Sequence, residues 1–258
     1  MYTIAIANQK GGVGKTTTAV NLAACLAEMG RSTLLVDMDP QAQTSTCLRI
    51  EETNVSGTIF DVLLGESSAK KVLPEFTVSV GEKLDLLPSR LLSPKEEGEL
   101  ASGPSQNLRL KRVLNALSEK YDFCVIDCTP SLGIHTFNSL LASDAVILTI
   151  QTSFLALHGV GRILNVINRI KADYKHEPKV FALATMFDRR TRFSQDVLVD
   201  MRNYFQNGLF DTVIRNNVKL REASSFGRPI NEYAPRSAGS EDYRALAMEV
   251  LKKIVRSK

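Results

Sequence analysis

The sequence predicts a doubly wound α/β fold, in which helices cover both faces of a mostly parallel sheet. Three observations support this prediction. Apolar segments of strand length alternate with helical patterns along nearly the whole chain. Residues 145–150 form an almost entirely apolar run, which is typical of parallel strands buried on both faces. The chain has 258 residues, 44% of them hydrophobic, so it can form one large core, and we expect a single domain over residues 1–258.

The expected elements follow one another in a regular order. Strands are predicted at 2–8, 32–37, 84–87, 123–127, 145–151, 180–187 and 210–214. Residues 17–29 place apolar side chains three and four positions apart, which predicts a helix that ends at Gly30. A second amphipathic helix is expected over 240–255. Residues 89–107, with their prolines, glycines and glutamates, are expected to form an irregular surface excursion.

A glycine-rich segment joins the first strand to the first helix. It consists of Lys10, Gly11, Gly12, Val13, Gly14, Lys15, Thr16 and Thr17. In this position, glycines let backbone N–H groups close on phosphate oxygens, Lys15 neutralises the β and γ phosphates, and the Thr16 hydroxyl can hold Mg²⁺. The segment therefore predicts an ATP site built from these eight residues, with ATP and Mg²⁺ as cofactors.

The segment departs from the general P-loop pattern at its start. Gln9 replaces the first glycine, and an additional lysine stands at position 10. Lys10 cannot easily reach the same phosphates as Lys15 from the same loop, so we expect it to reach a nucleotide bound by a second subunit. In these features the chain resembles the deviant Walker A ATPases, and among them the ParA/Soj family of partition ATPases. The resemblance implies that Lys10 crosses a dimer interface to the partner's ATP, and that Lys10 and Lys15 are catalytic.

Two acidic segments resemble the switch regions of that family. Asp37-Met38-Asp39-Pro40-Gln41 matches its switch I, which implies that Asp39 positions or activates the attacking water and lies at the metal. The other interpretation of Asp39 is a helix N-cap, since Asp before Pro is a frequent helix start. Asp127 ends a strand about a hundred residues after the P-loop, and the segment 127–133 resembles the family's Walker B and switch II. Asp127 would then hold Mg²⁺ through water, whereas Thr129 stands where the family usually has proline.

Two later segments extend the resemblance. Residues 186–191 look like the family's M-x-D-x-R-T segment near the adenine, which implies that Met186 and Asp188 bind ATP and that a nearby arginine contacts DNA. Residues 213–223 resemble a segment that usually begins Ile-Pro-Arg-Asn, but here the basic residue has moved by one place. The implied DNA-binding residues are Arg190, Arg215, Lys219 and Arg221. Ordinary solvated basic side chains remain the alternative.

The charges are unevenly distributed along the chain. Residues 1–150 hold 13 Lys and Arg against 17 Asp and Glu, whereas residues 151–258 hold 19 against 11, a net charge of +8. This excess suggests a polyanion partner, although a solvated charged face is the simpler explanation of the charge count alone. The four cysteines lack metal-like spacing and fit reduced core thiols, and we expect no signal peptide and no membrane span.

Three functions from different classes fit these observations. The favoured one is a slow ATPase of chromosome or plasmid partition, cytoplasmic and nucleoid-associated. It would form an ATP-sandwich homodimer, bind double-stranded DNA non-specifically, and be stimulated by a ParB-type centromere-binding protein. The second is a MinD- or FlhG-like positioning ATPase that binds membrane through the last helix, but core packing is favoured for that helix's apolar stripe. The third is a redox ATPase like the nitrogenase iron protein, which Cys128 does not favour because it directly follows Asp127.

Overall fold

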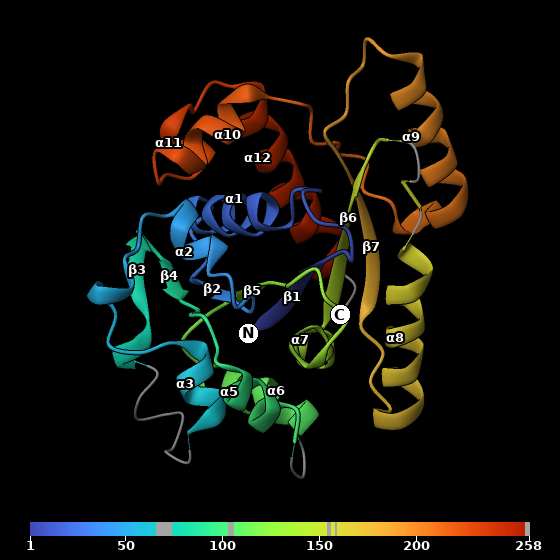
Figure 1. Ribbon diagram of the computed structural model, residues 1–258. Helices are drawn as coiled ribbons and strands as arrows, with labels where there is room; N and C mark the ends of the chain where they lie inside the picture. The colour runs from blue at the N-terminus through green and yellow to red at the C-terminus, as the bar shows by residue number, and fades with distance from the viewer. Residues whose placement is uncertain (66–73, 103–105, 154–155, 158, 256–258) are drawn as a thin grey trace.

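The computed structural model describes residues 1–65, 74–102, 106–153, 156–157 and 159–255 (Figure 1). Within these ranges seven strands form one sheet, in the order β3-β4-β2-β5-β1-β6-β7. The strands are β1 (Tyr2–Ala7), β2 (Thr33–Asp37), β3 (Val78–Gly81), β4 (Leu84–Leu87), β5 (Phe123–Asp127), β6 (Ala145–Gln151) and β7 (Lys179–Thr185). Only the β3–β4 pair among them is antiparallel. The predicted doubly wound α/β fold is therefore confirmed.

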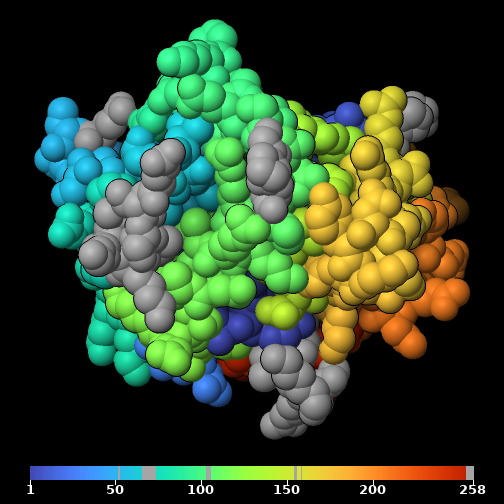
Figure 2. Space-filling view, turned by 90° about the horizontal axis from the view of Figure 1, so that it is seen from below, coloured from blue at the N-terminus to red at the C-terminus, as the bar shows by residue number. Residues whose placement is uncertain are grey.

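Helices cover both faces of this sheet. Most of one layer is formed by α1 (Lys15–Glu28), α2 (Gln43–Cys47), α10 (Val218–Ser225), α11 (Ile230–Tyr233) and α12 (Ala238–Val250). The other face and the β7 edge carry α3 (Ile59–Leu64), α5 (Pro94–Leu100), α6 (Arg109–Ala116), α7 (Ile134–Ala142), α8 (Val160–Tyr174) and α9 (Arg192–Phe205). Figure 2 shows this second face, with the green segment around α6 in its middle and α8, in yellow, beside it.

The central strand β1 explains why both faces need cover. Ile4 and Ile6 pack into the apolar cluster beneath α1 and α12, whereas Ala5 and Ala7 pack into the cluster on the opposite face. Alternate side chains of a strand point to opposite faces, so a strand with apolar side chains on both faces must be buried on both. All six residues of β1 are buried.

The predicted strand over 210–214 is wrong. The segment runs beside β7, and the N–H groups of Phe210 and Ile214 donate to β7 carbonyls. The N–H groups of Asp211 and Thr212, however, donate to the Glu249 carboxylate of α12, at 2.8 and 2.9 Å. In a regular strand these two N–H groups would donate to the backbone carbonyls of a neighbouring strand, but here they donate to the Glu249 side chain. The edge strand β3, by contrast, was not predicted, because it is short and only half-buried.

The predicted irregular excursion over 89–107 contains the helix α5. Ser93 accepts a hydrogen bond from the N–H of Glu96, and the Glu96 carboxylate accepts one from the N–H of Ser93, at 3.4 and 2.8 Å. This reciprocal capping box, with Pro94 in the first helical position, starts the helix. The Ser-Pro-Lys-Glu sequence carried that signal.

The apolar stripe of the last helix faces the core, as favoured. Tyr243, Leu246, Ala247 and Val250 are buried, and α12 packs against α1. The Tyr243 hydroxyl lies 3.1 Å from that of Thr18. After Val250 the chain continues as a π-helix over Leu251–Val255. No helix in the described part of the chain is long and apolar enough to cross a membrane.

Candidate nucleotide-binding site

The glycine-rich loop has the backbone shape that phosphate binding requires. Gly12 and Gly14 have φ angles of 72° and 87°, in the left-handed region that favours glycine. Helix α1 starts directly after Gly14, at Lys15. Its first N–H groups and the positive end of its dipole therefore face the loop, which suits an anionic ligand. Thr185 of β7 donates a hydrogen bond to the Val13 carbonyl, at 2.9 Å, and ties the loop to the sheet.

The two lysines of the loop differ in their surroundings. Lys15 is only 7% exposed, and its Nζ donates to the Lys10 carbonyl at 3.2 Å. Burial lowers the pKa of Lys15, while the charges of Asp127 and Asp39 act in the opposite direction. Lys10, in contrast, is exposed and lines a surface hollow of about 670 Å³ beside Arg162 of α8. Lys15 thus stays within the loop, and Lys10 extends from it.

Asp127 is a buried carboxylate at the end of β5. Its Oδ2 accepts a hydrogen bond from the Thr44 hydroxyl at 2.8 Å, whereas its Oδ1 is buried without a partner among the described residues. Complete burial raises the pKa of Asp127 to about 6, although the hydroxyls of Thr16 and Thr44 and the charge of Lys15 counteract this rise. A buried carboxylate with a free oxygen is stabilised by a bound cation.

Asp37 and Asp39 have separate roles in the switch I segment. Asp37 is fully buried opposite Asp127 in the β2–β5 ladder, and its carboxylate accepts the N–H groups of Asp39 and Thr44 at 3.0 and 3.2 Å. Burial and the neighbouring charge of Asp127 raise the pKa of Asp37 well above its usual range. Asp39 accepts the N–H of Gln41 at 3.0 Å. The alternative that Asp39 caps a helix is wrong, because the N-cap of α2 is Ala42.

These donors fit a magnesium ion. The Thr16 hydroxyl and the carboxylates of Asp39 and Asp127 are hard oxygen donors of the kind that Mg²⁺ prefers. The described residues contain no group of three or more His, Cys, Asp or Glu side chains suited to a metal. An ion held mainly by phosphate oxygens and water, with one or two protein ligands, needs no such group.

A cavity of about 310 Å³ adjoins the start of α1. Met186, which the sequence analysis assigned to the adenine region, lines it together with Gly14, Thr17 and Thr185. Six other residues of its wall were not predicted from the sequence to bind ATP or DNA, namely Gln151, Ile214, Asn216, Asn217, Leu220 and Tyr243. The two asparagines directly follow the chain segment that runs beside β7. Because ligands bind at strand ends in such sheets, this polar pair could have indicated a ligand contact. Asp188 is not among the described residues that line this cavity, and its carboxylate binds Arg190 through two hydrogen bonds of 2.9 and 2.8 Å.

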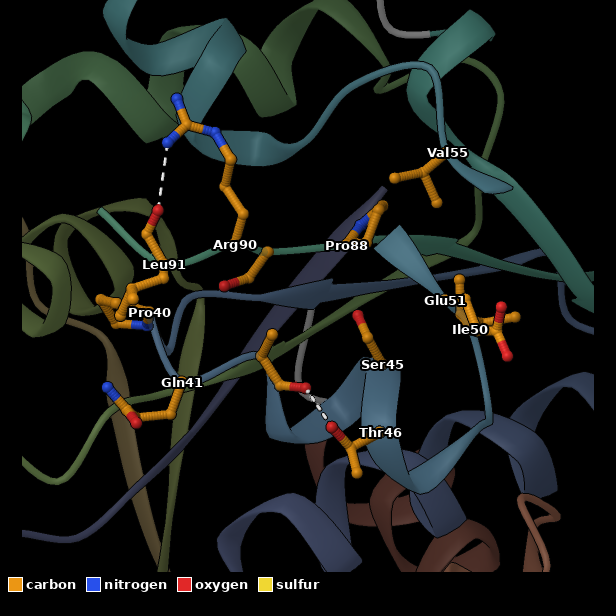
Figure 3. A pocket seen from close by; sticks show the side chains of 12 residues that line it. Pro40, Gln41, Ser45, Thr46, Ile50, Glu51, Val55, Pro88, Arg90 and Leu91 are labelled. Atoms are coloured by element: carbon orange, nitrogen blue, oxygen red, sulfur yellow. Dashed lines mark hydrogen bonds between the residues drawn. The ribbon is translucent and has the colours of Figure 1, made fainter. Parts of the chain in front are cut away.

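A second cavity, of about 360 Å³, lies on the other side of switch I. Figure 3 shows its wall, formed by Pro40 and its neighbours, by α2, and by the segment around Arg90 after β4. The Ser89 hydroxyl donates to the Asp39 carbonyl and joins that segment to switch I. Ser45 of α2 is also part of this wall, but its hydroxyl is itself buried and has no hydrogen-bond partner among the described residues. None of the glycine-rich loop lines this cavity, so it lies beside the phosphate site and not within it.

The four basic residues assigned to DNA are placed differently. Arg215 pairs with Asp242 at 2.7 Å and with Glu241 at 3.0 Å, which anchors it to α12. Lys219 pairs with Glu222 at 2.7 Å on the surface of α10. Arg221 is exposed and also lines the 310 Å³ cavity. Arg190 lies in the loop before α9, with its side chain 83% exposed. Lys219 and Arg221 therefore share one helix, whereas Arg190 lies on another segment.

Comparisons with known proteins agree with this architecture. A family model described as an AAA domain matches residues 1–180. The chain is 42% identical over 248 residues to the sporulation initiation inhibitor protein Soj of Bacillus subtilis (strain 168), covering 96% of this chain and 97% of that protein. It is 39% identical over 251 residues to the chromosome partitioning protein ParA of Myxococcus xanthus (strain DK1622), covering 97% and 88% of the two chains.

Solved structures share the same fold. Cobyrinic acid a,c-diamide synthase from Mycobacterium smegmatis, with bound ATP analog and magnesium, is 32% identical with a TM-score of 0.85, covering 100% of this chain and 97% of that one. A putative plasmid partition protein from Borrelia burgdorferi B31, bound to AMPPNP, is 25% identical with a TM-score of 0.82, covering 98% and 99%. The chain therefore belongs to the Soj/ParA family of chromosome and plasmid partitioning ATPases, within the MinD/ParA superfamily.

Proposed function

We propose that this chain is a partition ATPase that binds ATP and Mg²⁺, hydrolyses ATP slowly, and forms a dimer with the nucleotides between its subunits. The placement of the two lysines supports this proposal most directly. Lys15 is buried in the loop, where it meets the phosphates of its own subunit, and Lys10 is exposed at the edge of that loop. An exposed lysine in this position can add a positive charge to a nucleotide held by a second copy.

The residues of the site have distinct roles in hydrolysis. The N–H groups of residues 11–17 and the amine of Lys15 bind the phosphates. Thr16 and Asp127 would hold Mg²⁺, with Asp39 close to it, and the ion would neutralise charge on the β and γ phosphate oxygens. Asp39 orients the attacking water. Met186, which lines the 310 Å³ cavity, would contact the base. Asp188 remains a candidate ATP contact that must first release Arg190.

DNA binding is assigned to the basic C-terminal part of the chain. Arg221 on α10 supplies positive charge to phosphates without reading bases, and Lys219, Arg190 and Arg215 do so once phosphate displaces the carboxylates that pair with them. Dimerisation doubles this surface and makes the affinity depend on ATP. The proposal includes a ParB-type centromere-binding protein that accelerates hydrolysis and thereby releases the DNA, in the cytoplasm and at the nucleoid. It also includes a single domain over residues 1–258, because α12 packs on α1.

The structure supports neither a membrane-binding positioning ATPase nor a redox ATPase. A MinD-like membrane helix needs an apolar stripe that is free to enter a bilayer, but Tyr243, Leu246 and Val250 are buried against the core. A bridging iron–sulfur cluster needs an exposed thiol, but Cys128 is 1% exposed, and burial raises its pKa to about 12.

The proposal is tested by binding to random-sequence duplex DNA with ATP and with ADP. We expect tight, salt-sensitive binding with ATP, weak binding with ADP, and persistent binding of the Asp39→Ala variant because its ATP is not hydrolysed. Each phosphate contact should contribute a slope of about −0.9 to a plot of log K against log salt. Equal affinity with ATP and ADP, or no effect of salt, would contradict the proposal.

A further inference from the structure

Helix α2 connects the phosphate site to the helix that carries Lys219 and Arg221. At its start, Thr44 binds two carboxylates of the site: its N–H donates to Asp37 at 3.2 Å and its hydroxyl donates to Asp127 at 2.8 Å. Both carboxylates are fully buried, so these bonds are shielded from water. The position of α2 is therefore fixed by Asp37 and by Asp127, the carboxylate proposed to hold Mg²⁺.

The other end of α2 is held by α10. The two helices pack against each other. Burial raises the pKa of the Cys47 thiol, and the hydroxyl of Ser224, which lies against it, partly offsets this. Two residues beyond α2, the Nη2 of Arg49 donates to the Ser225 carbonyl at 2.9 Å. The guanidinium of Arg49 also lies 6.0 Å from the ring centroid of Phe226, which stacks on Tyr233 at 5.2 Å.

The backbone at this contact is specialised on both sides. Arg49 has a φ of 52°, a left-handed conformation that few residues other than glycine adopt. It faces Gly227, whose φ is 69°. A Cβ at position 227 would lie 2.6 Å from Arg49 Cδ and 2.7 Å from Arg49 Cβ. The Cβ atom cannot move by a change of rotamer, so an alanine at position 227 displaces Arg49 from Ser225 and Phe226.

We propose that Arg49 is a positioning residue that ties switch I to α10, so that the nucleotide state sets the placement of Lys219 and Arg221. This inference rests on the proposed function, since it assigns the part of the chain through which ATP controls DNA binding. Arg49 is a charged side chain that follows α2 and contacts the C-terminal end of α10 through Ser225 and Phe226. It therefore links the segment 39–49 to α10. Arg49 touches neither the phosphate loop nor the 310 Å³ cavity.

The test compares DNA affinity with ATP and with ADP in four variants. Gly227→Ala keeps every charge, so it removes the contact without removing a possible phosphate ligand. Arg49→Gly removes the side chain and relieves the left-handed backbone, so it keeps the fold. Arg49→Lys keeps a cation near Ser225, and Arg169→Ala on α8 is the charge-matched control, with an exposed side chain.

We expect the ratio of the ADP to the ATP dissociation constants to fall at least about fivefold in Gly227→Ala and Arg49→Gly, the lower end of ordinary coupling between sites. Basal ATP hydrolysis and ATP affinity should stay unchanged, Arg49→Lys should retain most of the ratio, and Arg169→Ala should retain all of it. In the Arg49→Gly background, Gly227→Ala should add little further loss of coupling, because the side chain that it displaces is already absent.

The outcomes separate this inference from the proposed function. If the wild-type protein binds DNA equally with ATP and ADP, the proposed function fails and the role of Arg49 fails with it. If the wild-type ratio is large and Gly227→Ala or Arg49→Gly retains it in full, the partition function stands and the role of Arg49 is overturned. A uniform loss of affinity with both nucleotides and of thermal stability would likewise overturn it, since that is the result of a purely structural contact.

Discussion

Replacing Asp127 with asparagine should stabilise the nucleotide-free protein at pH 7. Burial raises the pKa of this carboxyl from 3.8 to about 6, so ionised Asp127 opposes folding above pH 6. A rise of about two pKa units corresponds to about 3 kcal/mol at 1.36 kcal/mol per unit. Asparagine is neutral, has nearly the same shape, and can still accept the Thr44 hydrogen bond. For a chain of this length, about 3 kcal/mol raises the melting temperature by roughly 6–12 °C.

The stabilisation by Asp127→Asn should depend on pH. Because the pKa is higher in the folded state, protonation of Asp127 favours folding, and its destabilising effect grows as the pH rises from about 4 to about 6. The advantage of Asp127→Asn should therefore be complete at pH 7, about half as large at pH 5, and nearly absent at pH 4. Thermal unfolding at the three pH values measures it. The matched control is Asp173→Asn on α8, whose side chain is 52% exposed, with a change within about 0.5 kcal/mol.

Magnesium and ATP should reduce the difference in melting temperature between the two proteins. A bound cation removes the cost of ionised Asp127, so Mg²⁺ and ATP should raise the melting temperature of the wild type more than that of Asp127→Asn. If the variant is no more stable than the wild type at pH 7, or gains as much from Mg²⁺ and ATP, then Asp127 is not the buried, cation-seeking carboxylate described above.

Three further changes probe other parts of the structure. Tyr243→Phe removes the buried hydroxyl that meets Thr18 at 3.1 Å and should lower the free energy of unfolding by about 1 kcal/mol in urea titration; no loss would mean that this bond is absent in solution. Ser93→Ala removes the capping box of α5 and should cost about 1 kcal/mol, whereas Ser56→Ala, at an exposed position outside any helix, should cost less. Leu35→Ala, at a fully buried position of β2, should cost about 2–5 kcal/mol, and a loss below 1 kcal/mol would contradict the packing of this face.

The sequence predicted well those parts of the fold that local pattern determines. Strands β4, β5 and β6 begin and end at the predicted residues, because each is a mainly apolar segment bounded by polar or turn residues. Helix α5 could have been predicted from its Ser-Pro-Lys-Glu start. The segment 210–214 could not, since its apolar pattern is that of a strand, and the carboxylate that takes two of its N–H groups comes from Glu249 in a distant helix.

Some features of the candidate site could also be predicted from the sequence, whereas others could not. The glycine-rich loop and the aspartates at strand ends are contiguous motifs, so their positions could be predicted, although their catalytic roles remain predictions. The role of Asp37 could not be assigned, because it depends on hydrogen bonds to Asp39 and Thr44 that the fold creates. The ion pairs of Arg215 with Asp242 and of Arg190 with Asp188 likewise show that a basic residue in the sequence is not a free charge on the surface.

The molar mass of the ATP complex in solution shows whether Lys10 joins two subunits. The Asp39→Ala variant, measured by light scattering after size exclusion with Mg²⁺ and ATP, should have twice the mass of one chain, and with ADP the mass of one chain. Adding Lys10→Ala should return the ATP complex to the mass of one chain while the protein still binds ATP. A dimer of unchanged stability in the doubly substituted protein would contradict the assignment of Lys10 to the partner's nucleotide.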